Sequence, residues 1–294
     1  MFRNPGPRET TEGMHSIYDF PDIYERVLCH PPEVVEAEVR SIHALLSQRG
    51  IASGRLLEAA CGTSAHGIRL AQCGFQVTGI DTSTRMLAGA RERAAVAGVA
   101  LDLRHADMLE FHLGGERYDG AIFMSETFPL LTERDAIARH FRCIHTHLRP
   151  GGLYIIDIDA HHHGVGSTYE VWGQKTLPLE HGHVEVWHES FPGDWVASTQ
   201  KLVLHCRICL GTAVYETTDT WVLRVDSPWH LAVLADILPG WSLVGFYSWR
   251  DLVRLHCRGT ALFHGLGMTR RAKHNIGVQA TAYSVRCAPA FGRA

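Results

Sequence analysis

Between residues 55 and 157, short apolar runs alternate with segments of helical periodicity, and this alternation constrains the fold more than any other feature. Segments such as Ser83 to Ala97 carry their apolar residues on one helical face. The apolar runs lie at Leu56-Leu57, Phe75 to Asp81, Leu101 to His105, Tyr118 to Met124 and Leu153 to Asp157. Such alternation predicts an α/β fold in which helices cover both faces of a doubly wound, mostly parallel sheet.

Two further helices are predicted from apolar stripes. Val35, Val39, Ile42 and Leu46 form the stripe of a helix that Gly50 ends. The second helix has its stripe at residues 137 to 148, and Thr132 with Asp135 three residues later resembles a capping box at its start.

The pattern becomes antiparallel after Asp159. Alternating apolar residues in Lys201 to Leu210 have period two, and residues 166 to 226 are predicted to form an insertion of about three strands. Ser227-Pro228 starts another helix, and strands at 242 to 247 and 280 to 287 complete a sheet of seven strands. We therefore expect an N-terminal lid with helices (1–50), a core (51–160), the antiparallel insertion (161–226) and a C-terminal part that completes the sheet (227–294).

Composition excludes several classes of partner. With 46% hydrophobic residues the 294-residue chain can bury a full core, and its formal net charge of -3 favours neither nucleic acid nor an anionic membrane surface. No apolar run approaches the length of a membrane span, and the first residues lack a signal-peptide pattern, so a cytoplasmic protein is expected. Its eight irregularly spaced cysteines are interpreted as free thiols.

A turn of small residues joins the first strand of the core to the next helix. It reads Glu58-Ala59-Ala60-Cys61-Gly62-Thr63-Ser64, and the following strand ends on Asp81. Such a turn lets a ligand approach the backbone, and the carboxylate can accept both ribose hydroxyl protons. The G-x-G-x-x-G pattern that holds a pyrophosphate is missing, because Ala60, Gly62 and Ala65 stand at its positions. The residues thus predict a site for an adenosine-containing cofactor, and this site lacks the glycine pattern that would hold phosphates.

From Tyr18 to Asp157 the chain resembles the class I methyltransferases that use S-adenosylmethionine. The resemblance rests on five pieces in order, which are Leu57 to Thr63, Val77 to Ser83 with Met86-Leu87, Ala106 to Met108, Tyr118-Asp119, and Leu148 to Gly152. It implies the Rossmann-like fold of that superfamily. The insertion resembles those of small-molecule N-methyltransferases, where such hairpins cover the acceptor or pair two subunits, which suggests a homodimer.

The resemblance also implies roles for individual residues. The backbone of Ala60, Cys61 and Gly62 would lie along the methionine part of S-adenosylmethionine, and Asp81 would bind the ribose. Further contacts would come from Thr82 and Met86 beside the adenosine, Asp107 and Met108 on the adenine, Ser125 beside the sulfonium and Tyr18 in the N-terminal lid. Ala60 and Ser64 depart from the family, which usually has glycine there, so their side chains intrude on the turn.

Alternative interpretations remain for these residues. Asp81 and Asp107 could cap the helices or turns that follow them, and Glu58 is expected to support the site rather than act in catalysis. Cys206 and Cys209 look like a metal motif, but residues three apart on a strand face opposite sides and could not share an ion, so no metal site is predicted. Four tryptophans of the insertion, Trp172, Trp187, Trp195 and Trp221, favour hairpin core over a substrate cage.

The predicted reaction moves the methyl group of S-adenosylmethionine to a nitrogen or oxygen of a small-molecule acceptor, with S-adenosylhomocysteine as product. An unprotonated amine needs no general base, whereas a hydroxyl acceptor would need one of the candidates His161, His163 or Glu126. The run His161-His162-His163 could equally be a solvated loop. A non-catalytic protein that binds the nucleoside, and a nicotinamide-dependent oxidoreductase that uses Asp81, are the alternative functions.

Overall fold

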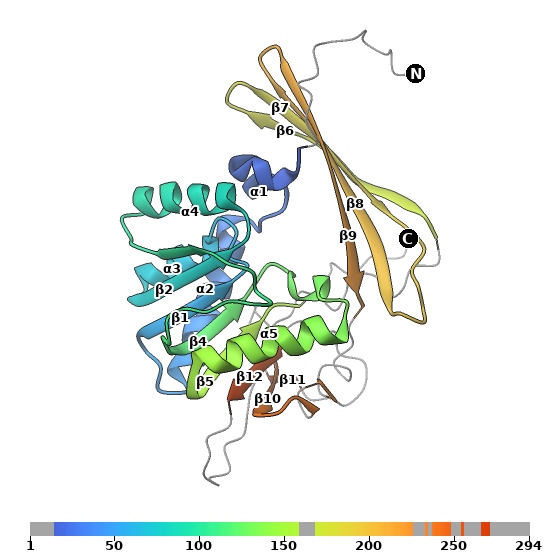
Figure 1. Ribbon diagram of the computed structural model, residues 1–294. Helices are drawn as coiled ribbons and strands as arrows, with labels where there is room; N and C mark the ends of the chain where they lie inside the picture. Colours follow the sequence, from blue (N-terminus) through green and yellow to red (C-terminus); the bar gives the residue numbers. More distant parts are fainter. Residues whose placement is uncertain are drawn as a thin grey trace, which may run out of the picture. The chain divides into compact units, whose positions relative to one another are not determined.

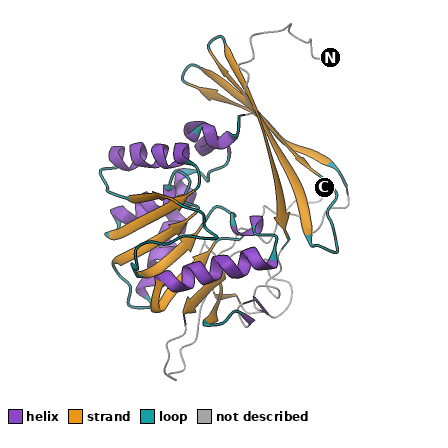
Figure 2. Cartoon of the chain, viewed as in Figure 1, coloured by secondary structure: helices purple, strands orange, loops and turns teal. Residues whose placement is uncertain are grey.

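The computed structural model describes residues 15–158, 168–225, 233–234, 237–247, 254–255 and 266–270. The chain divides into two compact units, one formed by Met1–Cys29 with Val165–Leu223 and the other by His30–Gly164 with Arg224–Ala294. Figure 2 shows that helices and strands are interspersed in the second unit, whereas long strands dominate the first. Within the described residues, no helix has the length and apolar character required to cross a membrane.

The larger unit contains a sheet in which five neighbouring strands are parallel, in the order β3-β2-β1-β4-β5. These strands are β1 (Gly54–Ala59), β2 (Phe75–Asp81), β3 (Asp102–His105), β4 (Tyr118–Phe123) and β5 (Leu148–Ile156). Beyond β5 lie β12 (Leu266–Arg270), β10 (Trp241–Tyr247) and β11 (Arg254–Leu255), each antiparallel to its neighbour. The doubly wound fold is confirmed, but the described sheet has eight strands instead of seven because the two-residue β11 pairs at its edge.

Helices cover both faces of this sheet (Figure 1). On one face, α2 (Pro32–Ser47) and α3 (Ala65–Gln72) bury Val39, Ile42 and Leu70 against strand residues such as Val77. On the other face, α5 (Arg134–His147) buries Ile137, Phe141 and Ile144 against Phe123 and other strand residues. The helix α4 (Thr84–Val96) joins β2 to β3 and begins with the Ser83 hydroxyl, which accepts a hydrogen bond from the Met86 backbone N–H. The predicted capping box of α5 is wrong, because its N-cap is Glu133 and no side chain makes a capping bond there.

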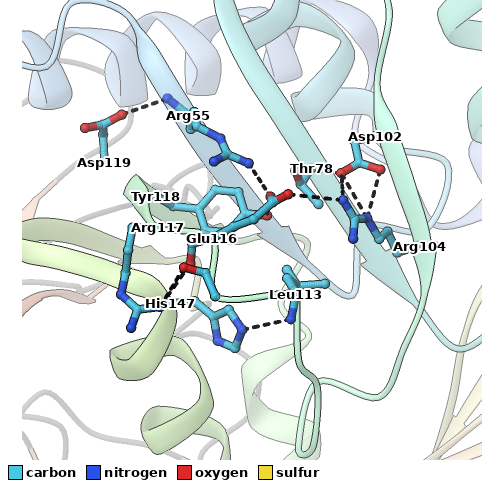
Figure 3. A network of polar contacts seen from close by, with 11 residues as sticks. Arg55, Thr78, Asp102, Arg104, Leu113, Glu116, Arg117, Tyr118, Asp119 and His147 are labelled. Carbon is cyan, nitrogen blue, oxygen red and sulfur yellow. Dashed lines mark hydrogen bonds and ion pairs between the residues drawn. The ribbon is translucent and has the colours of Figure 1, made fainter.

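The connection from β3 to β4, residues 106–117, contains no helix, although parallel strands are usually joined through one. A network of charged side chains lies beside this connection (Figure 3). Glu116 accepts hydrogen bonds from the guanidinium of Arg55 and from the Tyr118 hydroxyl, and Arg104 lies between Glu116 and Asp102. Ion pairs and hydrogen bonds between side chains thus link β1, β3 and β4 where no crossover helix packs on the sheet.

The smaller unit contains an antiparallel sheet in the order β6-β7-β8-β9. Its strands are β6 (Glu170–Leu179), β7 (Gly182–Ser190), β8 (Thr199–Leu210) and β9 (Ala213–Arg224). The predicted number of about three strands is too low. Gly173, Lys175 and Pro178 obscure the apolar alternation of β6, and most of its residues are exposed.

One face of this second sheet packs on the N-terminal segment. Ile17 in η1 (Ile17–Asp19) and Ile23 and Val27 in α1 (Pro21–Val27) join a buried cluster with strand residues such as Val184 and Ile208. Asp219 of β9 accepts hydrogen bonds from the Ser16 hydroxyl at 2.5 Å and the Ile17 backbone N–H at 2.8 Å. Segments far apart in the sequence therefore share one core.

Several expectations for the C-terminal part concern residues that the structure does not describe. The predicted strand at 280 to 287 and the start of the helix at Ser227-Pro228 lie outside the described residues. Leu234 and Leu238 contact the core cluster on the α5 side, and β10 confirms the strand predicted at 242 to 247. The strand that pairs with β5 is β12, within a stretch for which the sequence predicted no element.

A buried carboxylate holds α2 to α3. Glu38 of α2 is 2% exposed, and its two oxygens lie 2.8 Å from His30 Nδ1 and 2.9 Å from His66 Nε2 of α3. Burial by itself raises the pKa of Glu38, but the hydrogen bonds and positive charges of both histidines outweigh burial and hold this pKa at about 2. The folded state therefore favours ionised Glu38.

We predict that Glu38→Gln destabilises the protein in a pH-dependent way. Because the pKa of Glu38 falls from 4.5 to about 2 on folding, its stabilisation is present above pH 4.5 and is lost as the pH falls towards 2. Urea unfolding should show a loss of about 3 kcal/mol at pH 7 that shrinks steadily below pH 4.5. Glu36→Gln, an exposed change on the same helix, is the control, and a loss that does not vary with pH would contradict the prediction.

Candidate functional site

The turn after β1 has an unusual backbone. Ala60, Gly62 and Ser64 have φ angles of 48°, 53° and 57°, in the left-handed region that favours glycine. Ala60 and Ser64 stand where the family that the chain resembles usually has glycine. The structure shows that both adopt the conformation for which glycine is suited, so the shape of the turn is kept at an energetic cost.

Hydrogen bonds tie this turn to the end of β2. The Cys61 N–H donates to the Ile80 carbonyl at 2.9 Å, and the Gly62 N–H donates to Asp81 Oδ2 at 2.8 Å. The Cys61 side chain is 7% exposed and lies over Gly79, where an added Cβ would come within 2.9 Å of its sulfur. Burial raises the pKa of the Cys61 thiol well above its usual value. Its side chain therefore acts in packing, and only its backbone lies along the turn.

Asp81 joins two elements through its carboxylate. Oδ2 accepts the Gly62 N–H, and Oδ1 accepts the Ser83 N–H at 2.8 Å at the start of α4. A carboxylate oxygen can accept two hydrogen bonds, so each oxygen keeps the capacity to accept a ligand hydroxyl. The capping role considered for Asp81 is thus real, and it orients the carboxylate without using all of its acceptor capacity.

Ser64 directs its side chain into the protein. It is fully buried, and its hydroxyl donates to Glu58 Oε2 at the end of β1. The Gly67 N–H of α3 also bonds to Glu58, and an added Cβ at Gly67 would overlap both side chains. Burial raises the pKa of Glu58, although the charge of His66 and these hydrogen bonds act in the opposite direction. Glu58 therefore supports the turn from behind.

Thr82 and Met86 differ in exposure. Thr82 is exposed, and its carbonyl accepts a hydrogen bond from His105 Nε2 at 2.8 Å. Met86 is only 1% exposed and packs its side chain into the core. Of the two residues expected beside an adenosine, Thr82 is the more accessible.

Asp107 and Met108 follow the end of β3. Asp107 is exposed, and its Oδ1 accepts the Leu109 N–H at 2.8 Å, which is the turn-capping bond considered for it. Met108 is half-buried, and its carbonyl accepts a hydrogen bond from His140 Nδ1 at 3.0 Å. His140 comes from α5 and is separated from Met108 by 32 residues, and no motif in the sequence marks it.

Backbone strain marks the end of β4. Ser125 and Glu126 are consecutive non-glycine residues with left-handed φ angles of 58° and 56°. The Glu126 N–H donates to Asp157 Oδ2 at 3.3 Å, and Asp157 is 4% exposed at the end of β5. Such strain is typical of functional sites. Asp157 was recognised from the sequence only as the end of a strand.

The carboxyl ends of β1 to β5 carry, in turn, the bend at residues 60–64, Asp81, Asp107, Ser125 and Asp157, so these positions share one edge of the parallel sheet. Ligands of open α/β sheets bind at this edge. Tyr18 belongs to the other unit, where its ring lies 5.6 Å from that of Tyr24, and its role as a lid stays a prediction. His161 and His163 lie outside the described residues.

Metal chemistry finds no support in the part of the chain that the structure describes, which contains no group of His, Cys, Asp or Glu able to hold an ion. Cys206 is buried among apolar residues of the second sheet, while Cys209 pairs with His183 on the opposite face. Residues three apart on a strand face opposite sides, so the two thiols are still not expected to share an ion.

Comparisons with known proteins agree with this geometry. A family model described as a methyltransferase domain matches residues 56–152. The putative methyltransferase YqeM of Bacillus subtilis is 28% identical over 186 residues, which are 63% of this chain and 69% of that protein. The dTDP-3-amino-3,4,6-trideoxy-alpha-D-glucopyranose N,N-dimethyltransferase of Streptomyces venezuelae is 26% identical over 47% of this chain and 56% of that enzyme. The second match thus spans only about half of each protein.

Solved structures extend the likeness of fold beyond the matched domain. An S-adenosylmethionine-dependent methyltransferase from Clostridium acetobutylicum has a TM-score of 0.71 to this chain at 13% identity. The superposition covers 87% of this chain and 99% of the other. At this identity the likeness establishes the fold, and it confirms the predicted Rossmann-like architecture with an antiparallel insertion.

We predict that substitutions at Ser64 separate the stabilisation by its hydrogen bond to Glu58 from the cost of its left-handed backbone. Ser64→Ala removes the hydroxyl that donates a hydrogen bond to Glu58, and it should lower the free energy of unfolding by about 1–2 kcal/mol. Ser64→Gly removes the same donor but relieves the left-handed backbone, so it should be about 1 kcal/mol more stable than Ser64→Ala. Urea unfolding measures both, with the exposed Ser47→Ala as control. Equal stability of the alanine and glycine variants would contradict the assignment of strain.

Proposed function

We propose that this chain, which carries a methyltransferase domain of the class I, S-adenosylmethionine-dependent kind, transfers a methyl group to a small-molecule acceptor. The observation that carries the proposal is the left-handed turn at residues 60–64, tied to Asp81 at the end of the next strand. A turn of this shape with a neighbouring carboxylate suits a nucleoside, and it lacks the glycine pattern of a pyrophosphate site.

The residues present fit S-adenosylmethionine. Asp81 keeps acceptor capacity for ribose hydroxyls, and exposed Asp107 offers a carboxylate to the adenine amino group. The backbone from Ala60 to Gly62 is proposed to lie along the methionine part, and Ser125 to lie near the sulfonium. Thr82, Met86 and Met108 would complete the adenosine contacts. When bound, S-adenosylmethionine supplies an activated methyl group, so the protein needs mainly to align the acceptor and exclude water.

A nitrogen acceptor is the favoured form of the proposal. The sugar N,N-dimethyltransferase of Streptomyces venezuelae is one of the sequence relatives. In addition, the sequence of this protein has no evident Ser-His-Asp triad that would serve as a general base system. An amine that arrives unprotonated needs no base. With a hydroxyl acceptor, Glu126 would take the proton, because it is half-buried beside the strained backbone at the end of β4. The expected homodimer, and His161 or His163 as alternative bases, remain parts of this proposal.

The main reason to consider a non-catalytic binding protein was the absence of glycine at positions 60 and 64. Because Ala60 and Ser64 adopt left-handed backbone angles and Ser64 turns its hydroxyl towards Glu58, this reason loses weight. The catalytic form is therefore the one we propose.

We predict that Asp81→Ala abolishes most binding of S-adenosylhomocysteine. Loss of two ribose hydrogen bonds to a carboxylate, at about 1.5 kcal/mol each, should raise the dissociation constant roughly 100-fold. Isothermal titration calorimetry with the full chain measures this constant, and thermal unfolding verifies that the variant is folded.

Asp102→Ala is the matched control. Asp102 is an acid of the same sheet, but it lies at the amino end of β3 and pairs with Arg104, so the dissociation constant should change by less than about threefold. Undiminished binding by a folded Asp81→Ala variant would contradict the assigned ribose site. Absence of binding by the unchanged protein at millimolar ligand would end the proposal.

A further inference from the structure

The segment that carries Asp107 and Met108 depends on side chains for its conformation. Residues 106–117 join β3 to β4 without a helix, so only short turns and an isolated bridge provide regular backbone hydrogen bonds there. Buried backbone N–H and C=O groups nevertheless need hydrogen bonds. The source of those bonds decides what holds this segment in place.

Three residues of α5 provide these bonds. His140 Nδ1 donates to the Met108 carbonyl at 3.0 Å, and the Cys143 thiol donates to the Leu109 carbonyl at 3.2 Å. His147 Nε2 accepts the Leu113 N–H at 3.2 Å, as Figure 3 shows. Positions 140, 143 and 147 share one face of a helix. One stripe of α5 therefore fixes the segment from Met108 to Leu113.

His140 is itself held in one orientation. It is fully buried, and its Nε2 lies 2.5 Å from the hydroxyl of Tyr154 on β5. Since Nδ1–H donates to a carbonyl, Nε2 must accept from the Tyr154 hydroxyl. Burial lowers the pKa of His140 to about 4, so the imidazole is neutral at physiological pH. The neutral ring presents one donor and one acceptor, and both are used.

A single peptide unit connects His140 to Asp107. The peptide between Met108 and Leu109 has its carbonyl held by His140 and its N–H held by Asp107 Oδ1 at 2.8 Å. The orientation of the Asp107 carboxylate thus depends on this peptide, and the peptide depends on His140. The route runs from a buried ring to an exposed carboxylate at the ligand-binding edge of the sheet.

We infer that His140 is a positioning residue for adenine recognition. It fixes the Met108-Leu109 peptide, and through that peptide it aims Asp107 at the amino group of the adenine. This inference rests on the proposed function, because it assumes that S-adenosylmethionine binds at this edge. Beyond the proposed binding of S-adenosylmethionine, the inference assigns a role to His140, which does not touch the ligand, and names the hydrogen bonds through which His140 acts.

The test compares two ligands that differ only at the adenine amino group. S-adenosylhomocysteine carries the amino group, and the analogue with an unsubstituted purine, S-nebularinylhomocysteine, carries a hydrogen in its place and keeps N1 as an acceptor. Isothermal titration calorimetry gives the ratio of the two dissociation constants for each variant of the full chain. The unchanged protein should prefer S-adenosylhomocysteine about tenfold or more, because the analogue leaves Asp107 without a donor. A general loss of stability would weaken both ligands alike and leave the ratio unchanged.

His140→Asn and His140→Leu form a matched pair, because the two new side chains have the same number and branching of heavy atoms. Both lose the ring and its bond to Tyr154, but the asparagine amide can still donate from the position of Nδ1 to the Met108 carbonyl. The asparagine variant should keep the preference within about threefold of the unchanged protein, and the leucine variant should lose most of it. His147→Phe, which affects only the far end of the segment at Leu113, should keep the preference.

Each outcome decides the inference. If folded His140→Leu keeps the preference of the unchanged protein, His140 has no positioning role. If the asparagine and leucine variants lose the preference equally, the bond from Nδ1–H to the Met108 carbonyl is not the route, and the inference is overturned. If His140→Leu does not fold, Tyr154→Phe replaces it, because loss of the hydroxyl frees the ring and should lower the preference about threefold. An unchanged ratio in Tyr154→Phe would then overturn the inference. If the unchanged protein binds neither ligand, the proposed function itself fails.

Discussion

The carboxylate of Asp81 is the interaction on which the arrangement of the candidate site depends. One oxygen accepts the Gly62 N–H and the other accepts the Ser83 N–H, so a single side chain joins the left-handed turn after β1 to the first residues of α4. Because backbone N–H groups approach both oxygens, the carboxylate has little freedom to rotate, and its remaining lone pairs have defined directions. A ligand hydroxyl would meet an acceptor that is already oriented, which reduces the entropy cost of binding.

The same principle, in which side chains fix a backbone that has no regular structure, recurs between β3 and β4. Such a connection normally forms a helix, whose own hydrogen bonds pair its backbone groups. Here side chains of α5, which is remote in sequence, bond to backbone groups of the connection through two histidines and a thiol. The charged network around Glu116 completes the closure of the sheet beside it. The irregular segment is thus held by bonds from a rigid helix in addition to its own turns.

The sequence predicted most regular elements of the core, because their apolar periodicity reflects burial directly. The strand from Phe75 to Asp81 has the bounds that were expected, and α2 and α4 lie where their stripes predicted them. Prediction failed where polar contacts or exposed strands decide the structure. The strand β6 was not predicted, because Gly173 and Pro178 interrupt its apolar alternation. The helix α5 starts without the expected capping box. For the site, residue types indicated Asp81 and Asp107, but the sequence offers no signal that distinguishes His140 from the other 19 histidines. Its role follows from a contact across 32 residues, which only the folded chain creates.

The shared core of the N-terminal segment and the second sheet has a consequence for biosynthesis. Arg26 bonds to a carbonyl 152 residues later in the chain, and Ser16 bonds to a carboxylate 203 residues later. During translation, the apolar partners of Ile17, Ile23 and Val27 therefore emerge only after β1 to β5 and the helices between them have been synthesised. Closure of this long loop is therefore expected to be a late step in folding.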